Sequence, residues 1–195
     1  IGVRLVGSEM CIRDSARGVS FRFIHCSNSG AILNNYGEIF NTVRVGMLAY
    51  GVAPSDEVPM KINVEPVMSF CGPIVSLRTV SKNTPVSYGG IYLTKNNTNI
   101  GVIQMGFADG VPRPWYEDGY ISYKGEKYNI AGRICMDQFM VDFGDVEPKI
   151  GEEVLVFGKE KDDFIPIETI AKKTNTTTYA LLTACLLYTS DAADE

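Results

Sequence analysis

The sequence has little of what metal-bound and disulfide-stabilised proteins need. It contains one histidine and five cysteines, and the cysteines are widely scattered with no CxxC pair. Structural zinc sites and disulfide frameworks both depend on paired or closely spaced cysteines. We therefore expect no metal site and no disulfide framework. Scattered thiols of this kind are typical of a reducing compartment, which predicts a cytoplasmic location.

Two further absences argue against whole classes of partner. The 18 basic residues are outnumbered by 23 acidic ones, for a net charge of −5, whereas nucleic-acid binding needs clustered lysine and arginine. No apolar run approaches the ~20 residues of a membrane-spanning helix. We therefore expect neither nucleic acid nor a membrane as partner. A hydrophobic content of 45% over 195 residues instead indicates one large domain or two small ones.

The two ends of the chain are unlike the rest. Residues 1–15 include the run LVGSEMCIRDS, which has no helical or strand periodicity, and residues 185–195 read CLLYTSDAADE. Both resemble translations of the transposon adapters used in preparing sequencing libraries. We interpret them as adapter-derived artefacts and exclude them from reasoning on the fold. A genuine N-terminal arm and acidic tail is the alternative. The natural segment is then 16–184, an internal fragment.

Between these ends the apolar pattern changes near Pro54. An apolar run at 19–26 predicts a buried strand, and Asn28 and Ser29 are good N-cap residues for a helix after it. Residues 41–51 then read as a strand entering a short helical turn. This order is typical of a parallel α/β unit.

Beyond a turn-rich linker the chain reads as mostly β. Its β-branched runs predict strands, Lys124-Gly125-Glu126 predicts a hairpin turn, and 165–175 reads as a helix. The fold class is therefore α/β plus β, the end of an α/β domain followed by a mostly β domain. We expect the boundary near residues 52–62.

One candidate site lies in the α/β part. His25 stands at a strand end, and ligands gather at strand C-termini in parallel α/β domains. The Ser29 hydroxyl and the backbone N–H groups of Gly46 and Met47 suit an anion, with Arg44 as a nearby cation. The residues thus suggest a phosphate site. Ordinary capping by Ser29 and a solvent-facing Arg44 explain the same pattern.

Three glycine-rich segments lie in the β part: PVSYGG (85–90), MGFADG (105–110) and GRICMDQ (132–138). Taken singly, each is explained by a β-turn with a packed ring or a capped turn. In order with HCSNS (25–29) and VRVGMLAYG (43–51), they resemble the C-terminal part of alanine racemase, a pyridoxal 5'-phosphate (PLP) enzyme. The resemblance covers about residues 19–184.

The resemblance implies a fold and five residues on the cofactor side of the site. Residues 16–56 would end a PLP-binding (β/α)8 barrel of the TIM type, and 57–184 would form a C-terminal β domain truncated at its end. Ser29, Gly46 and Met47 would bind the cofactor phosphate, Arg44 the pyridine nitrogen, and His25 would support Arg44 by hydrogen bonding.

The resemblance also implies a catalytic residue and a substrate site. Tyr88 would be one of two bases on opposite faces of the substrate, the other being the cofactor lysine. The Met136 backbone N–H would hold the substrate carboxylate. Phe107 stands where the family commonly has tyrosine, and Ala180 where it usually has glutamate. These sites would be shared across a homodimer interface.

The implied function is interconversion of L-alanine and D-alanine for peptidoglycan in a bacterial cytoplasm. No lysine here sits in a motif comparable to that of the cofactor lysine, so we expect the isolated chain to be inactive. Two alternatives stay open: a PLP-dependent racemase or decarboxylase acting on another amino acid, and a non-catalytic β domain used for binding or dimerisation. We also expect residues 60–160 to fold as a unit and 16–52 to be poorly supported.

Overall fold

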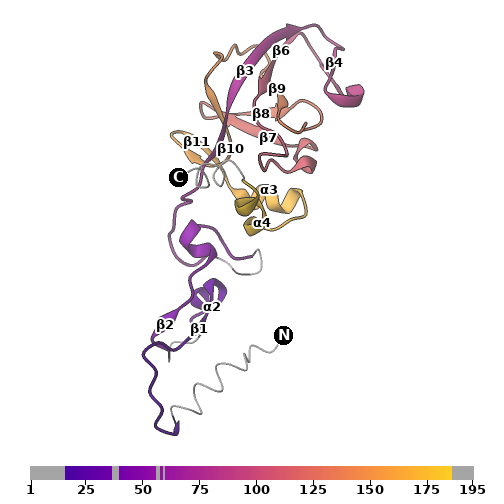
Figure 1. Ribbon diagram of the computed structural model, residues 1–195. Helices are drawn as coiled ribbons and strands as arrows, with labels where there is room; N and C mark the ends of the chain where they lie inside the picture. The colour runs from indigo at the N-terminus through magenta and orange to yellow at the C-terminus, as the bar shows by residue number, and fades with distance from the viewer. Residues whose placement is uncertain (1–15, 37–39, 56–57, 59, 186–195) are drawn as a thin grey trace, which may run out of the picture. The chain divides into compact units, whose positions relative to one another are not determined.

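The computed structural model describes residues 16–36, 40–55, 58 and 60–185. The chain divides after Glu65 into two compact units, the N-terminal unit (1–65) and the C-terminal unit (66–195) (Figure 1). The boundary expected near residues 52–62, and the implied domain bounds 16–56 and 57–184, stay predictions. The adapter-like ends fall outside the described residues, apart from Cys185.

The N-terminal unit contains a strand–helix–strand arrangement. Strands β1 (His25–Ser27) and β2 (Thr42–Val43) pair in parallel, and helix α2 (Ser29–Leu33) lies between them in the chain. Asn28 is the N-cap of this helix, because its Oδ1 accepts a hydrogen bond from the Ala31 backbone N–H at 3.0 Å. The expected parallel α/β order is confirmed.

The strand expected over 19–26 is wrong at its first six residues, since β1 begins only at His25. The side chains of Val19, Phe21 and Phe23 are exposed rather than buried. An alternating apolar run becomes a strand only where a neighbouring chain can pair with it. The short helical turn expected after β2 is confirmed as η1 (Met47–Tyr50).

The C-terminal unit is built on a seven-stranded antiparallel sheet in the order β11-β10-β3-β6-β9-β8-β7. Strand β10 also pairs with β7, so the six strands from β10 to β7 close into a barrel-like ring. Closure leaves these strands no free edge. The strands are β3 (Phe70–Val80), β6 (Thr98–Ile103), β7 (Tyr120–Tyr123), β8 (Glu126–Ile130), β9 (Phe139–Asp142), β10 (Glu153–Glu160) and β11 (Asp163–Ile165).

The hairpin between β7 and β8 forms where the sequence predicts it. Lys124 and Gly125 have φ values of 52° and 83°, and two positive φ angles are what a type I′ hairpin turn requires. The Asp163 carboxylate accepts hydrogen bonds from the Ser122 hydroxyl and from the Gly125 N–H. This carboxylate therefore ties the hairpin to β11.

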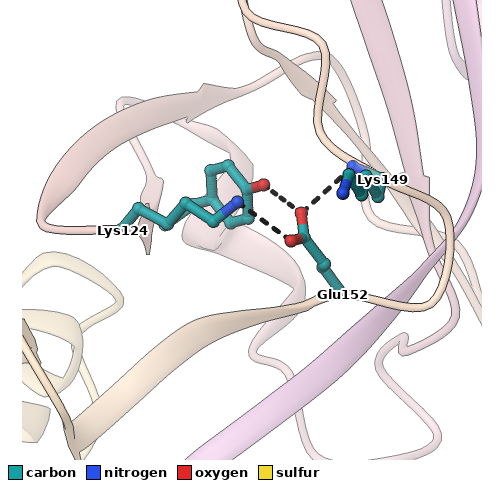
Figure 2. Close-up of polar contacts among 4 residues, drawn as sticks. Lys124, Lys149 and Glu152 are labelled. Atoms are coloured by element: carbon teal, nitrogen blue, oxygen red, sulfur yellow. Dashed lines mark hydrogen bonds and ion pairs between the residues drawn. The ribbon is translucent and has the colours of Figure 1, made fainter.

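The seam where β7 meets β10 carries a second carboxylate. Glu152 accepts hydrogen bonds from the Tyr123 hydroxyl, from Lys124 Nζ at 2.9 Å and from the Lys149 backbone N–H at 3.1 Å (Figure 2). These hydrogen bonds lower the pKa of Glu152 from 4.5 to about 2, and the bond from Tyr123 has the largest effect. Across this seam only Leu155 of β10 and Ser122 of β7 are paired as strand residues. The side-chain hydrogen bonds of Glu152 therefore add to a short backbone pairing between the two ends of the ring.

The core of the C-terminal unit lies inside the sheet and beneath two helices, α3 (Ile167–Lys173) and α4 (Thr178–Ala184). The helix expected over 165–175 is confirmed, with its apolar face buried. Large side chains that are essentially fully buried include Trp115, Phe139, Phe143, Phe157, Ile74, Ile103, Met105, Ile121, Ile134, Leu155, Ile165 and Ile170.

A small hairpin stands apart from the closed ring in the pairing scheme. Strands β4 (Pro85–Val86) and β5 (Tyr92–Leu93) pair antiparallel, and the turn η2 (Tyr88–Gly90) connects them. A further short helical turn, η3 (Arg113–Tyr116), follows the MGFADG segment.

Candidate functional site

The first group of expected site residues follows β1 and β2 in the N-terminal unit. Ser29, the first residue of α2, is buried, and its Oγ accepts hydrogen bonds from the backbone N–H of Gly46 at 3.0 Å and of Leu48 at 3.4 Å. Met47 lies between these two donors at the start of η1. The structure therefore brings the Ser29 hydroxyl and the turn at Gly46 together.

His25 and Arg44 complete this group. Both are exposed, and Arg44 directly follows β2, its backbone N–H donating to the Ser27 carbonyl at 2.7 Å. Within the described part of the chain, neither side chain has a hydrogen bond or ion pair. The expected support of Arg44 by His25 therefore stays a prediction. A permanent cation two residues before Gly46 fits a phosphate-bearing ligand.

The second group lies in the C-terminal unit and begins with Tyr88. This residue opens the turn η2, and its side chain is 71% exposed. The preceding residue, Ser87, has φ 66° and ψ 179°, a backbone conformation that is essentially restricted to glycine. Holding a serine there costs about 1–3 kcal/mol, and residues with such strain cluster at functional sites.

Phe107 and Met136 belong to two loops that interlock through their backbones. The Phe107 N–H donates to the Cys135 carbonyl at 3.0 Å, and the Ala108 N–H donates to the Met136 carbonyl at 2.9 Å. A Cβ at Gly106 would stand 2.2 Å from the Met136 oxygen, so only glycine permits this approach. Both Phe107 and Met136 keep exposed side chains.

The turn bearing Tyr88 is joined to the Met136 loop by one side-chain bond. Ser87 Oγ donates to the Arg133 carbonyl at 2.8 Å, and the Arg133 guanidinium lies against Gly89, within η2. The sequence singled out the three segments but neither Ser87 nor Arg133 as a site residue. The sequence marks these two residues only by their position, because Ser87 directly precedes Tyr88 and Arg133 directly follows Gly132.

The three substrate-side residues expected from sequence all lie in the C-terminal unit. Tyr88, Phe107 and Met136 stand on loops linked by hydrogen bonds within one unit. The five cofactor-side residues lie in the N-terminal unit.

A hydrogen-bonded carboxylate holds the far end of the Tyr88 hairpin. Asp142 accepts from the Tyr92 hydroxyl at 2.6 Å and also from the Thr98 hydroxyl. The pKa of Tyr92 is raised, mainly because the hydroxyl is partly buried and also because it donates a hydrogen bond to Asp142. Tyr92 therefore stays protonated and acts as a donor that anchors β5 to β9.

Phe107 also borders a cavity of about 310 Å³ whose lining includes Arg113 and Ala180. The Arg113 guanidinium lies 5.8 Å from the centre of the Phe107 ring. Both positions at which the sequence departs from the family pattern, Phe107 and Ala180, therefore border the same cavity. A change at one of them alters the surroundings of the other.

Two kinds of feature are absent from the described residues. No group of three or more histidine, cysteine, aspartate or glutamate side chains there is placed to hold a metal ion. No helix in the same part of the chain is long and apolar enough to cross a membrane.

Comparison with known proteins gives one family. Residues 67–187 match the family described as alanine racemase, C-terminal domain. Alanine racemase 2 of Caldanaerobacter subterraneus subsp. tengcongensis is 36% identical over 170 residues, which are 87% of this chain and 44% of that protein. Alanine racemase of Desulforamulus reducens is 35% identical over 168 residues, or 85% and 45%.

Solved structures agree with these matches. Alanine racemase of Clostridium difficile 630 in complex with cycloserine has a TM-score of 0.80 at 34% identity, covering 90% of this chain and 46% of that one. Alanine racemase of Bartonella henselae with covalently bound pyridoxal phosphate has a TM-score of 0.75 at 26% identity, covering 90% and 48%. The chain spans less than half the length of these relatives.

Proposed function

The chain belongs to the alanine racemase family, and we propose that its protein interconverts L-alanine and D-alanine by a PLP-dependent two-base mechanism. The observation that carries this proposal is that Tyr88, Phe107 and Met136 stand on loops of the C-terminal unit that hydrogen bonds join. Similar alanine racemases were solved with cycloserine and with L-Ala-P, which supports alanine as the substrate.

The residues of the N-terminal unit would hold the cofactor. The residues present fit PLP, because the buried Ser29 hydroxyl, which accepts from the Gly46 N–H, still has its own proton to donate to a phosphate. In this proposal Ser29, Gly46 and Met47 bind the phosphate, while Arg44 donates to the pyridine nitrogen and His25 supports Arg44. When bound, PLP supplies an electron sink that makes the α-proton of alanine acidic. A guanidinium does not give up its proton, so Arg44 would keep that sink weak.

Racemisation removes a proton from one face of the α-carbon and returns one to the other. Tyr88 would accept or donate that proton on one face, and its exposed phenol is free to meet a substrate. We propose that the second base is a cofactor lysine in the part of the relatives that this chain does not span. The chain alone would then be inactive.

Met136 and Phe107 would bind and enclose the substrate. The Met136 N–H would hold the alanine carboxylate, and the Phe107 ring would form an aromatic wall without the hydroxyl of a tyrosine. We further propose that two copies form a homodimer, with the β domain of one serving the cofactor of the other. D-alanine for peptidoglycan would be the product used in a bacterial cytoplasm.

We also propose the domain assignment implied by the family. Residues 16–56 would be the end of the PLP-binding barrel, 57–184 the C-terminal β domain, and the ends 1–15 and 185–195 adapter translations. The matches of 168 and 170 residues to curated relatives are of similar length to the segment between those ends.

The test uses the full-length protein, obtained by extending the coding sequence beyond both ends of this chain. L-alanine to D-alanine conversion is measured with PLP for the wild type, Tyr88→Phe and Tyr179→Phe. Removing a general acid–base group lowers rates by about 10²–10⁴-fold, so we expect kcat of Tyr88→Phe to fall by that factor with cofactor absorbance retained. Tyr179 is an exposed tyrosine on α4, and its variant should keep full activity.

Each result decides one point. Full activity in Tyr88→Phe would remove Tyr88 from the mechanism. A wild type that leaves alanine unchanged would overturn the proposed substrate, and racemisation of other amino acids would then be assayed with the same variants.

A further inference from the structure

We infer that Ser87 is a positioning residue that sets the catalytic Tyr88 relative to the loop of Met136. The inference rests on the proposed function of those two residues and deepens it. Its basis is a strained serine whose hydroxyl forms the side-chain hydrogen bond between the two loops.

The position of Tyr88 depends on its backbone. Its side chain is 71% exposed, so the neighbouring side chains of its own unit do little to hold the phenol. The turn around it has three positive φ angles, at Ser87 (66°), Gly89 (76°) and Gly90 (57°). The Gly90 N–H donates to the Ser87 carbonyl at 3.0 Å, which closes the turn. Ser87 therefore determines where the turn starts and in which direction it leaves β4.

Glycine would take the backbone conformation of Ser87 without strain. A serine at this position therefore indicates a use for its side chain. Ser87 Oγ donates to the Arg133 carbonyl at 2.8 Å, three residues before Met136. The hydroxyl thus fixes the start of the Tyr88 turn against the loop that would hold the substrate carboxylate.

The surroundings leave little freedom for another arrangement. A Cβ at Gly132 would stand 2.6 Å from the Ser87 Cβ, so the two backbones approach as closely as glycine permits. At the other end of the hairpin, the Tyr92 hydroxyl donates to Asp142 at 2.6 Å. The Tyr88 turn is therefore held at both ends, by Ser87 on one side and Tyr92 on the other.

Loss of the Ser87 bond would let the Tyr88 turn shift without unfolding the ring of strands. Misplacement of a reacting group by about 1 Å lowers rates by up to about 10²-fold. We expect Ser87→Gly and Ser87→Ala to lower kcat by about 10- to 100-fold, with KM changed less than threefold. Ser87→Gly keeps the positive φ free of strain, so it separates the role of the hydroxyl from that of the backbone.

The experiment measures kcat and KM in both directions for full-length wild type, Ser87→Gly, Ser87→Ala and Tyr88→Phe. It also measures the isotope effect with α-deuterated L-alanine and α-deuterated D-alanine. Because Tyr88 acts on one face only, Ser87→Gly should raise the isotope effect for one enantiomer and not for the other. A loss of general stability would not produce this asymmetry.

Thr84→Ala is the matched control. Thr84 Oγ1 donates to the Ser81 carbonyl at 2.6 Å near the base of the same hairpin, so the variant removes a similar bond away from the Met136 loop. We expect full kcat in this variant and melting temperatures within a few degrees of wild type for all variants.

The outcomes are distinct. Wild-type kcat in Ser87→Gly, or an equal loss in Thr84→Ala, would overturn the role of Ser87 while leaving the proposed function intact. An isotope effect that rises equally for both enantiomers would do the same. An inactive wild type, or a fully active Tyr88→Phe, would instead overturn the proposed function on which the inference rests.

Discussion

The two units of this chain reach stability by different means. In the C-terminal unit, six strands close into a ring around large buried side chains such as Trp115 and Phe139. In the N-terminal unit, the paired strands are two and three residues long. Its described part exposes many apolar side chains, namely Val19, Phe21, Phe23, Tyr36, Val43, Val45, Tyr50, Met60 and Ile62.

This difference matters because the two halves of the proposed site are divided between the units. On the substrate side, Phe107 and Met136 stand on loops of the closed ring, and Tyr88 stands on the small hairpin of β4 and β5. The cofactor-side residues stand on β1 or on the segments that directly follow β1 and β2, in a unit that leaves many apolar side chains exposed. We therefore expect the geometry around Tyr88 to survive in this chain better than that around Ser29.

Limited proteolysis of the 195-residue chain gives the largest expected contrast. Cleavage follows local opening, and sheet cores open with free energies several kcal/mol above those of poorly packed segments. We expect cuts within 16–52 to appear at least about 100-fold faster than cuts within 60–160. Equal rates in the two segments would show that the N-terminal unit is stable by itself, and would contradict the expected difference in stability between the units.

A core truncation tests the stability of the closed ring. Phe139 is fully buried on β9, and replacing a buried phenylalanine with alanine costs about 3–5 kcal/mol. We expect Phe139→Ala to lower the free energy of unfolding of the C-terminal unit by that amount in urea titrations. Phe164→Ala, at a half-exposed position on β11, should cost about 1 kcal/mol or less. A loss below about 1 kcal/mol in Phe139→Ala would contradict a tightly packed core.

Acid should weaken the contact between β7 and β10 at the seam. We expect this effect to be smaller than those of proteolysis and of Phe139→Ala. The pKa of Glu152 is lowered from 4.5 to about 2 in the folded chain, chiefly by the hydrogen bond from Tyr123. A lowered pKa adds stability that is present above pH 4.5 and lost as the pH falls towards 2. Glu152→Gln should therefore melt below the wild type at pH 7, and the gap should narrow between pH 4.5 and 2.

The control for the seam is Glu147→Gln, at an exposed carboxylate outside the seam bonds. It should follow the wild type across the same pH range. A gap between wild type and Glu152→Gln that is constant with pH would show that Glu152 acts through shape and not through charge.

Several features could be predicted from sequence because they depend on local chemistry. The Lys124–Gly125 turn needs positive φ at two positions, and the helix α3 shows its buried face in the spacing of Ile167, Ile170 and Ala171. The strand expected over 19–26 was mostly wrong for the opposite reason. An apolar run pairs only if a neighbouring strand is present, and local pattern does not contain that information.

The residues of the candidate site could likewise be predicted from sequence only in part. The family resemblance named Tyr88, Phe107 and Met136 from short ordered motifs. It did not name Ser87, whose importance depends on a φ angle and on an acceptor 46 residues away. A long-range hydrogen bond of this kind leaves no periodicity in the sequence.

The sequence by itself determined the family, the order of strands and helices in the β part, and the residue types available for catalysis. Only the tertiary structure decided that β10 closes on β7, that Glu152 bridges the seam there, and that the loops of Phe107 and Met136 interlock. The physical reason is that residue type and local backbone preference act over a few neighbours. Ring closure and loop contacts join residues far apart in the chain, and their geometry exists only once the core is packed.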